Sequence, residues 1–200
     1  MADSESRRLE NLFGSLLTAI SDSLTAQVEQ AAGHSGATAA ALTYLTQAPG
    51  LSIDRLKGPL GLSQSATVRL VDRLVTDGLA QRRPGRNGRS ISVHLTPPGE
   101  KVARSILDQR HAVLSAALAP LCGAERGALT VLVEKLLGHV TLCSPHAERI
   151  CRLCDTTSCP SMSCPVVLAA VQASGPAAGG RAELGAPGGI RTHTPFGNGF

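Results

Sequence analysis

The sequence contains very few aromatic residues and no long apolar run. Aromatics make up 2% of its 200 residues, and Trp is absent. This scarcity argues against a single-strand nucleic-acid binder, because such proteins stack bases on aromatic side chains. No stretch reaches the roughly 18 apolar residues of a membrane span, and the first residues do not read as a signal peptide. We therefore expect a cytoplasmic protein with no membrane partner and an aliphatic core.

Sequence patterns that are typical of catalytic sites are also missing. The sequence shows no Ser/His/Asp constellation, no phosphate-binding glycine loop and no paired carboxylates. Each of these patterns brings the groups of a known enzyme mechanism to one place. The sequence therefore predicts that the protein is not an enzyme, and its six cysteines are the only candidates for redox or metal chemistry.

The first half of the chain shows helical periodicity. Apolar residues recur every three or four positions over residues 7–31, which predicts a long amphipathic helix. A second helix is predicted over residues 37–47. A short helix over residues 53–57, a glycine-containing turn and a longer helix from the cap residue Ser63 to Thr76 follow. Short helix, turn and longer helix are the pattern of a helix-turn-helix.

A basic hairpin follows this pattern. Residues 79–84 and 90–96 are predicted to be strands on either side of a glycine-rich turn. In the second strand the apolar residues alternate with Ser92 and His94, which we expect to face away from the core. Two further amphipathic helices are predicted, one that Thr96 caps and that runs to about Leu121, and one over residues 124–142.

The helix that begins after Ser63 is predicted to have one apolar and one polar face. Arginine on the polar face can bind guanine edges or phosphates in a major groove, and arginine near the tip of a hairpin can reach phosphates or a narrow minor groove. The alternative is an ordinary solvated face. The predicted DNA-binding residues are Gln64, Ser65, Arg69, Arg73, Arg82, Arg83, Arg86 and Arg89.

Residues 62–74, LSQSATVRLVDRL, and the following Asp77-Gly78-Leu79 resemble the recognition helix of MarR-type regulators. The run RSISVHLT over residues 89–96 resembles the second wing strand of that family. The resemblance spans residues 9–142 in element order and is dense over 51–100. It departs from the family at Asn87, where an acidic residue is usual, and at Gly58-Pro59 before the turn.

The resemblance implies a mostly α fold with a small β-hairpin wing, in which a winged helix-turn-helix domain is joined to a helical dimerisation region. It also implies a homodimeric repressor that binds a palindromic operator in double-stranded DNA and is released by a small-molecule effector. Two alternatives remain at this stage. A metal- or thiol-based redox protein would not explain the basic hairpin, and a non-specific architectural DNA binder would not discriminate among duplexes.

Four cysteines are concentrated within residues 151–164. Their spacing allows a closed tetrahedral zinc site, and the alternatives are an iron–sulfur cluster, a redox switch and no role. Metal or redox change at this cluster is expected to alter the spacing of the two recognition helices and so relieve repression. The predicted metal ligands are Cys151, Cys154, Cys159 and Cys164.

The chain is therefore predicted to have five parts. They are an N-terminal dimerisation helix (1–34), a winged helix-turn-helix DNA-binding domain (35–98), C-terminal dimerisation helices (99–142), a Cys-rich metal or redox segment (143–165) and a disordered tail (166–200). Within the tail, Ile190-Arg191-Thr192 can be encoded by nucleotides that resemble the complement of a transfer-RNA T-arm, so we interpret the end of the chain as a reading-frame artefact.

Overall fold

The computed structural model describes residues 2–33, 36–85, 90–159 and 162–174. The fold is mostly helical with a small antiparallel sheet, as the sequence predicts. The elements in chain order are α1 (Ala2–Ala32), α2 (Gly36–Gln47), β1 (Leu51–Ser52), α3 (Ile53–Leu60), α4 (Gln64–Thr76), β2 (Ala80–Pro84), β3 (Ile91–Leu95), α5 (Pro97–Leu118), α6 (Gly123–Val140), α7 (Ser144–Cys151) and α8 (Pro165–Ala173).

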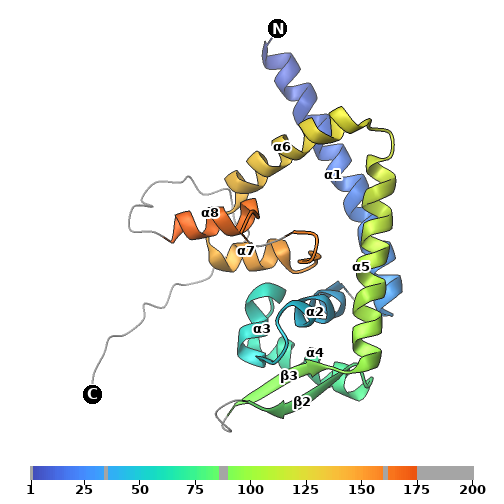
Figure 1. The fold of residues 1–200 in the computed structure, drawn as a ribbon, viewed down its shortest axis with the longest axis vertical. Helices are drawn as coiled ribbons and strands as arrows, with labels where there is room; N and C mark the ends of the chain where they lie inside the picture. The colour runs from blue at the N-terminus through green and yellow to red at the C-terminus, as the bar shows by residue number, and fades with distance from the viewer. Residues whose placement is uncertain (1, 34–35, 86–89, 160–161, 175–200) are drawn as a thin grey trace, which may run out of the picture.

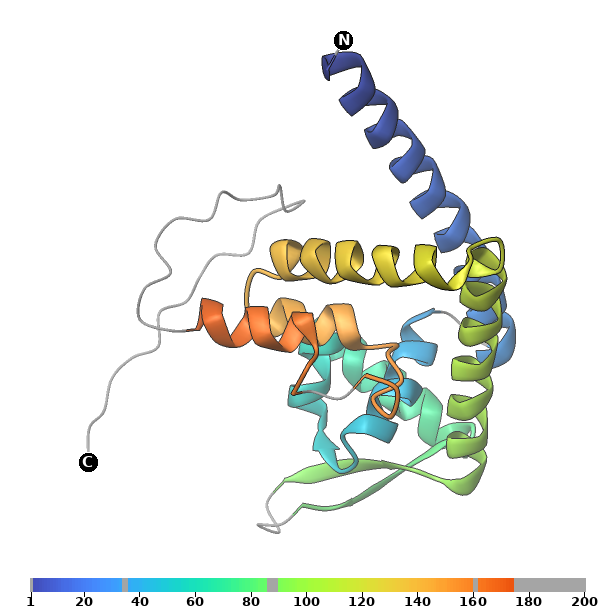
Figure 2. The same ribbon diagram turned by 45° about the horizontal axis from the view of Figure 1, so that its top comes forward.

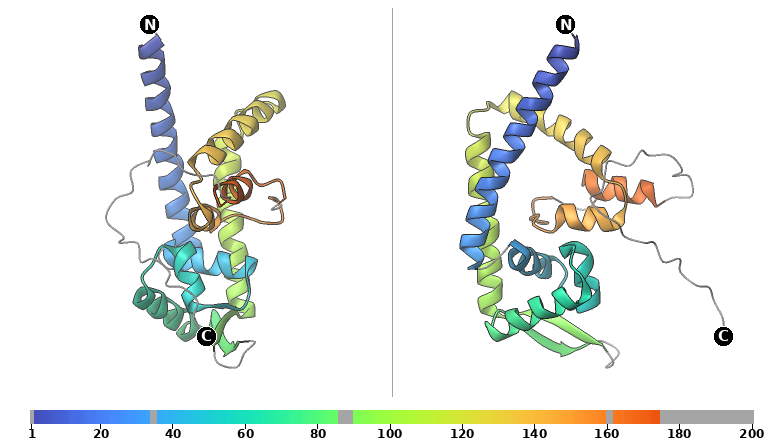
Figure 3. Two further views of the ribbon diagram at one scale, coloured as in Figure 1. Left: turned by 90° about the vertical axis from the view of Figure 1, so that its left-hand side faces the viewer. Right: turned by 180° about the vertical axis from the view of Figure 1, so that it is seen from behind.

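Two long helices form the frame of the molecule. Helices α1 and α5 lie side by side, with the winged domain of α2 to β3 packed at one end of α5 (Figure 1). From the other end of α5, helix α6 turns back across the molecule (Figures 2 and 3). Helix α7 then packs on α3 of the winged domain, and α8 packs on α6 and α7. The N-terminal half of α1 projects past α6, so much of its surface has no neighbour in the chain.

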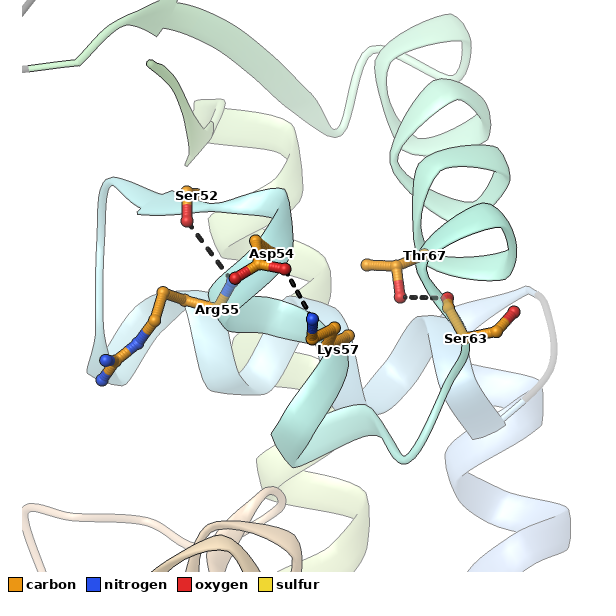
Figure 4. A network of polar contacts seen from close by, with 6 residues as sticks. All are labelled: Ser52, Asp54, Arg55, Lys57, Ser63 and Thr67. Atoms are coloured by element: carbon orange, nitrogen blue, oxygen red, sulfur yellow. Dashed lines mark hydrogen bonds and ion pairs between the residues drawn. The ribbon is translucent and has the colours of Figure 1, made fainter. Parts of the chain in front are cut away.

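Local capping defines the helix-turn-helix. The Ser52 hydroxyl accepts a hydrogen bond from the Arg55 amide and begins α3, and the Thr67 hydroxyl donates to the Ser63 carbonyl at the start of α4 (Figure 4). Gly61 ends α3 with φ of +64°, a conformation that glycine adopts without steric cost.

Helix α3 is longer than predicted. The sequence places its end at Lys57, before Gly58 and Pro59, but the helix continues to Leu60. Pro59 lies in the last turn, where its missing amide costs one hydrogen bond, and its ring is fully buried in the domain. The predicted boundary at Lys57 is therefore too early, and Gly61 ends the helix instead.

The sheet has three strands in the order β1-β3-β2, and the sequence predicts only the hairpin of β2 and β3. Ser92 shares a face with His94, as predicted, because its hydroxyl lies 3.1 Å from His94 Nε2, opposite the core residue Val93. The sequence did not indicate that Ser92 is buried on that face. Its hydroxyl donates to the Arg83 carbonyl at 3.1 Å, which removes the cost of burial. Ile91, one residue earlier, is instead half exposed.

The main core lies within the winged domain, where α2, α3, α4 and α5 meet. It is aliphatic, as the scarcity of aromatics predicts, and close packing of such side chains fixes the relative positions of these helices. Its largest fully buried apolar side chains are those of Leu42, Leu45, Leu56, Val71, Leu74, Val93 and Ile106. A second, smaller cluster joins α7 and α8 and includes Ala147, Cys164, Val166 and Ala170.

The predicted disordered tail begins too early. Residues 165–173 form α8, which buries three of its side chains, those of Val166, Ala169 and Ala170. Small apolar residues that look like a linker in sequence therefore serve as the buried face of a helix. The remainder of the predicted tail, including residues 190–192, lies outside the described residues.

No single helix within the described ranges is long and apolar enough to cross a membrane. Helices α5 and α6 meet the length and composition criteria only when they are taken together, and a bend of 115° separates them.

Candidate functional site

Helix α4 has the two faces that the sequence predicts. Thr67, Leu70, Val71 and Leu74 are buried against the core, which fixes the rotation of the helix about its axis. The four polar residues that the sequence assigns to DNA binding are all exposed on the opposite side, and they are Gln64, Ser65, Arg69 and Arg73.

The start of α4 is held by its own side chains. The Ser63 hydroxyl accepts a hydrogen bond from the Ala66 amide at 3.3 Å and lies 3.3 Å from the Ser65 hydroxyl. A cap of this kind stabilises a helix by about 1 kcal/mol, because it satisfies an amide that has no partner within the helix. The exposed residues of the first turn are therefore presented on an ordered backbone.

One arginine of the hairpin is already paired within the chain. Arg82 on β2 forms an ion pair with Asp72 of α4, with Nη2 and Oδ1 2.5 Å apart. Arg82 thus joins the wing to the recognition helix, a contact that sequence reasoning missed because the two residues belong to different elements. Arg83, on the same strand, is exposed. Arg86 and Arg89 lie outside the described residues.

The junction between α4, the wing and α5 is tightly built. The Thr96 hydroxyl donates to the Gly78 carbonyl at 2.5 Å and caps α5 by accepting from the Gly99 amide at 3.2 Å. The Thr96 amide donates to the Leu79 carbonyl at 3.0 Å. A Cβ on Gly99 would lie 1.9 Å from that carbonyl oxygen, so glycine is required for this close approach. Both ends of the hairpin are thereby fixed to α5.

The four cysteines of residues 151–164 come together in the structure, and we call them the thiol cluster. Side-chain interactions join Cys151 to Cys154 and to Cys164, and Cys159 to Cys164. The remaining two cysteines, Cys122 and Cys143, are exposed and lie outside the cluster. The sequence pattern therefore correctly identifies the residues that cluster.

The thiols of the cluster are electrostatically unequal. The hydrogen bond from Cys151 and the nearby Arg110 guanidinium together lower the pKa of Cys154 to about 6, against the opposing effect of burial. The same hydrogen bond, together with burial, raises the pKa of Cys151. Burial and the hydrogen bond to Cys164 raise the pKa of Cys159. Cys154 is thus the thiol that most readily exists as a thiolate.

Metal binding by the cluster stays a prediction. In the parts of the chain that the structure describes, no three His, Cys, Asp or Glu side chains are placed as they stand to hold a metal ion.

The thiol cluster lies against the winged domain, a position that its place in the sequence does not indicate. Helix α7 packs on α3, and α8 packs on α6 (Figure 1). The Gln47 side chain in α2 donates to the Cys154 carbonyl at 2.6 Å. Leu153 packs against the main core. The loop that follows α7 therefore contacts both α2 and the main core on which α4 packs.

Two cavities adjoin this region. One of about 350 Å³ lies among α1, α2, α3 and the thiol-cluster loop, and its lining includes Val28, Leu60 and Leu153 together with Arg110 and Arg152. The other, of about 310 Å³, is lined by residues of α5 and by Cys154 and Cys159. Arg110 lines both cavities.

Two helices present apolar surface to solvent. In α1 the exposed apolar residues recur at spacings of three and four, which places them on one face of the helix. Surfaces of this kind mark interaction sites. The exposed apolar residues are Leu9, Leu12, Phe13, Leu16 and Leu17 in α1, and Val131, Leu132, Val133, Leu136 and Val140 in α6.

Comparison with known proteins gives solved structures only. No protein-family model matches the chain, and no curated protein does. The YusO protein from Bacillus subtilis is 22% identical, with a TM-score of 0.61 over 68% of this chain and 96% of its own. A MarR family protein from Bacillus stearothermophilus is 20% identical, with a TM-score of 0.59 over 68% of this chain and 95% of its own.

The chain has the fold of the MarR family of transcription regulators. A MarR-family regulator from Silicibacter pomeroyi is 28% identical, with a TM-score of 0.50 over 64% of this chain and 87% of its own. The MarR fold confirms the predicted winged helix-turn-helix and its long flanking helices. It also agrees with the family that the sequence resembles.

Proposed function

We propose that the protein is a MarR-type transcription regulator that binds double-stranded DNA through α4 and the wing. The observation that carries this proposal is the exposed polar face of α4, with Arg69 and Arg73 on the helix and Arg83 on the neighbouring strand. Exposed arginines on a helix that is rigidly packed from behind are suited to a major groove. Helix α4 and the hairpin lie at the same end of the molecule (Figure 3), which lets both contact one duplex.

The regulator acts as a homodimer in this proposal. The apolar residues of α1 and α6 are exposed, and a second copy that covers them would pair two winged domains. A symmetric dimer reads a palindromic operator whose half-sites lie about 34 Å apart, or a multiple of that distance.

We also propose that the protein is a repressor that a small molecule releases. The cavity of about 350 Å³ lies between α1 and the winged domain, so a ligand there would bear on both. Its apolar lining and the guanidiniums of Arg110 and Arg152 favour a small, partly apolar anion. Zinc, and alternatively an iron–sulfur cluster, stay predictions for the thiol cluster, and elemental analysis of anaerobically purified protein tests them.

Fluorescence anisotropy tests the DNA-binding proposal. The probe is a duplex selected on the full chain from a random library, and it is compared with a scrambled duplex at several salt concentrations. We expect the selected duplex to bind more tightly by about 4–10 kcal/mol. If the side chain contacts a base, Arg69→Ala or Arg73→Ala should weaken binding to the selected duplex by about 1–3 kcal/mol.

A contact to phosphate alone gives a different result. In that case the substitution weakens both duplexes equally and reduces the slope of log affinity against log salt by about 0.9. The matched control is Arg8→Ala, at an exposed arginine of α1 far from α4, which should leave affinity unchanged. Equal affinity of the wild type for both duplexes would favour an architectural DNA binder, and no binding to either would refute the proposal.

A further inference from the structure

Helices α7 and α8 lie beyond residue 142, where the resemblance to MarR-type regulators ends. We call α7, α8 and the described loop residues between them the C-terminal unit. A small apolar cluster joins its two helices, and Leu137 of α6 packs against the same cluster. Among the described residues, α6 has no buried side chain, and α8 is the element on which it mainly packs. Within one chain, the C-terminal unit therefore holds the far end of α6 in place.

The other side of the C-terminal unit fits against the helix-turn-helix, where α7 packs on α3. A Cβ built on Gly58 would lie 3.4 Å from Glu148 Oε2 of α7. A Cβ built on Gly61 would lie 3.2 Å from the Arg149 guanidinium carbon, and Leu153 after α7 packs on the main core. Gly58 is one of the two residues before the turn at which the sequence departs from the MarR pattern. That departure thus coincides with the contact of the added unit.

These contacts close a triangle of helices (Figures 1 and 2). Helix α5 leads away from the winged domain, α6 returns after a bend of 115°, and the C-terminal unit joins α6 to α3. Two rods that meet at one corner can change the angle between them, whereas three connected sides fix every angle. The third side therefore holds α6 and the winged domain in one relative orientation.

The length of α5 shows how much the angle at this corner matters. Helix α5 has 22 residues. It spans about 33 Å, so a rotation of about 10° at the corner with α6 would move the winged domain by about 6 Å. One base pair of DNA adds about 3.4 Å along the helix axis. Without the third side, a small rotation is enough to shift the winged domain by more than one base pair.

We propose that the C-terminal unit determines which spacing of operator half-sites a dimer of this protein can bind. This inference rests on the proposed function, in which a second copy covers the apolar surface of α6 and each α4 binds one half-site. In such a dimer, the angle between α6 and the winged domain sets the distance between the two recognition helices. One added base pair moves a half-site by about 3.4 Å and turns it by about 35°. A dimer with a fixed angle must then distort the DNA or lose contacts.

The variant Ala147→Glu in the full chain tests this inference. Ala147 is buried in the small cluster between α7 and α8 and takes no part in the proposed DNA contacts. A carboxylate buried there without a partner should separate the two helices and open the triangle. Gln172→Glu, which adds the same charge at an exposed residue of α8, is the matched control. Circular dichroism and light scattering establish that each variant is folded and has the mass of the wild type.

Fluorescence anisotropy measures the discrimination between spacings. The probes are the selected duplex and duplexes whose half-sites are one or two base pairs closer together or further apart. We expect the wild type and Gln172→Glu to bind the altered duplexes at least about tenfold more weakly than the selected one. For Ala147→Glu we expect a difference of no more than about threefold. The ratio between duplexes is decisive, because a general loss of affinity cancels in it.

A second variant opens the same triangle from the winged domain. Gly58→Glu places a carboxylate beside Glu148, and the two like charges should loosen α7 from α3. Adding Glu148→Arg gives the pair opposite charges and should restore the discrimination between spacings. A protein that had simply lost its fold would not recover in this way, so this pair keeps the test decisive if Ala147→Glu does not fold.

Hydrogen exchange tests the triangle without DNA. In Ala147→Glu the amides of α3 and of the second half of α6 should exchange about tenfold faster than in Gln172→Glu. Unchanged exchange in both helices would overturn the inference. A wild type that tolerates every spacing, or a folded Ala147→Glu protein that discriminates as sharply as the wild type, would also overturn it. A wild type that binds no duplex would instead refute the proposed function and with it the role in spacing, while exchange would still show whether the C-terminal unit holds α6 to the winged domain.

Discussion

The substitution Gly99→Ala tests the close contact between α5 and Leu79, which fixes the position of the wing. Replacing Gly99 with alanine puts a methyl group where only 1.9 Å separates the new carbon from the Leu79 carbonyl oxygen. An ordinary carbon–oxygen contact is longer by more than 1 Å, so either α5 or the end of α4 must move. Because the obstacle is backbone, no rotamer change can relieve the clash.

Two opposing effects set the size of the change. Alanine favours helix over glycine by about 1 kcal/mol. Overpacking at a rigid contact costs about 1–3 kcal/mol, and weakening the Thr96–Leu79 hydrogen bond costs about 1 kcal/mol more. We expect Gly99→Ala to lower the free energy of unfolding by about 1–3 kcal/mol. The wing should also lose its fixed position, so affinity for the selected duplex should fall.

Urea unfolding followed by circular dichroism measures this difference, at one fixed chain concentration because dimerisation shifts apparent stability. The matched control is Gly127→Ala in α6, where an added Cβ meets nothing within 4 Å. That variant should gain about 0.5–1 kcal/mol from helix propensity alone. A Gly99→Ala protein as stable as Gly127→Ala would refute the reasoning from the close approach.

Three further predictions concern the recognition helix and the apolar faces. Arg82→Ala should weaken DNA binding less than Arg69→Ala in anisotropy titrations, because Arg82 is already paired with Asp72; a larger loss would show that the pair opens on DNA. Ser63→Ala should lower the urea-unfolding free energy by about 1 kcal/mol through loss of the α4 cap, and no loss would mean that the cap contributes nothing. Leu16→Glu should shift the mass measured by light scattering from dimer to monomer, since it charges the exposed apolar face of α1, and an unchanged mass would contradict that interface.

The sequence by itself determined the parts of the fold that depend on near neighbours in the chain. The caps at Ser63 and Thr96, the αL glycine after α4 and the buried face of that helix all follow from local chemistry and a period of 3.6 residues. The exposure of Arg69 and Arg73 follows from the same period.

Only the tertiary structure decided the features that join distant segments. The Asp72–Arg82 pair, the fit of Gly99 against Leu79 and the burial of Ser92 each depend on how two elements meet. Helix α8 was missed because small apolar residues become a buried face only when another element covers them. The thiol cluster could be found by spacing, but its contact with the helix-turn-helix could not, because the path of α6 back across the molecule is set by packing rather than by any local signal.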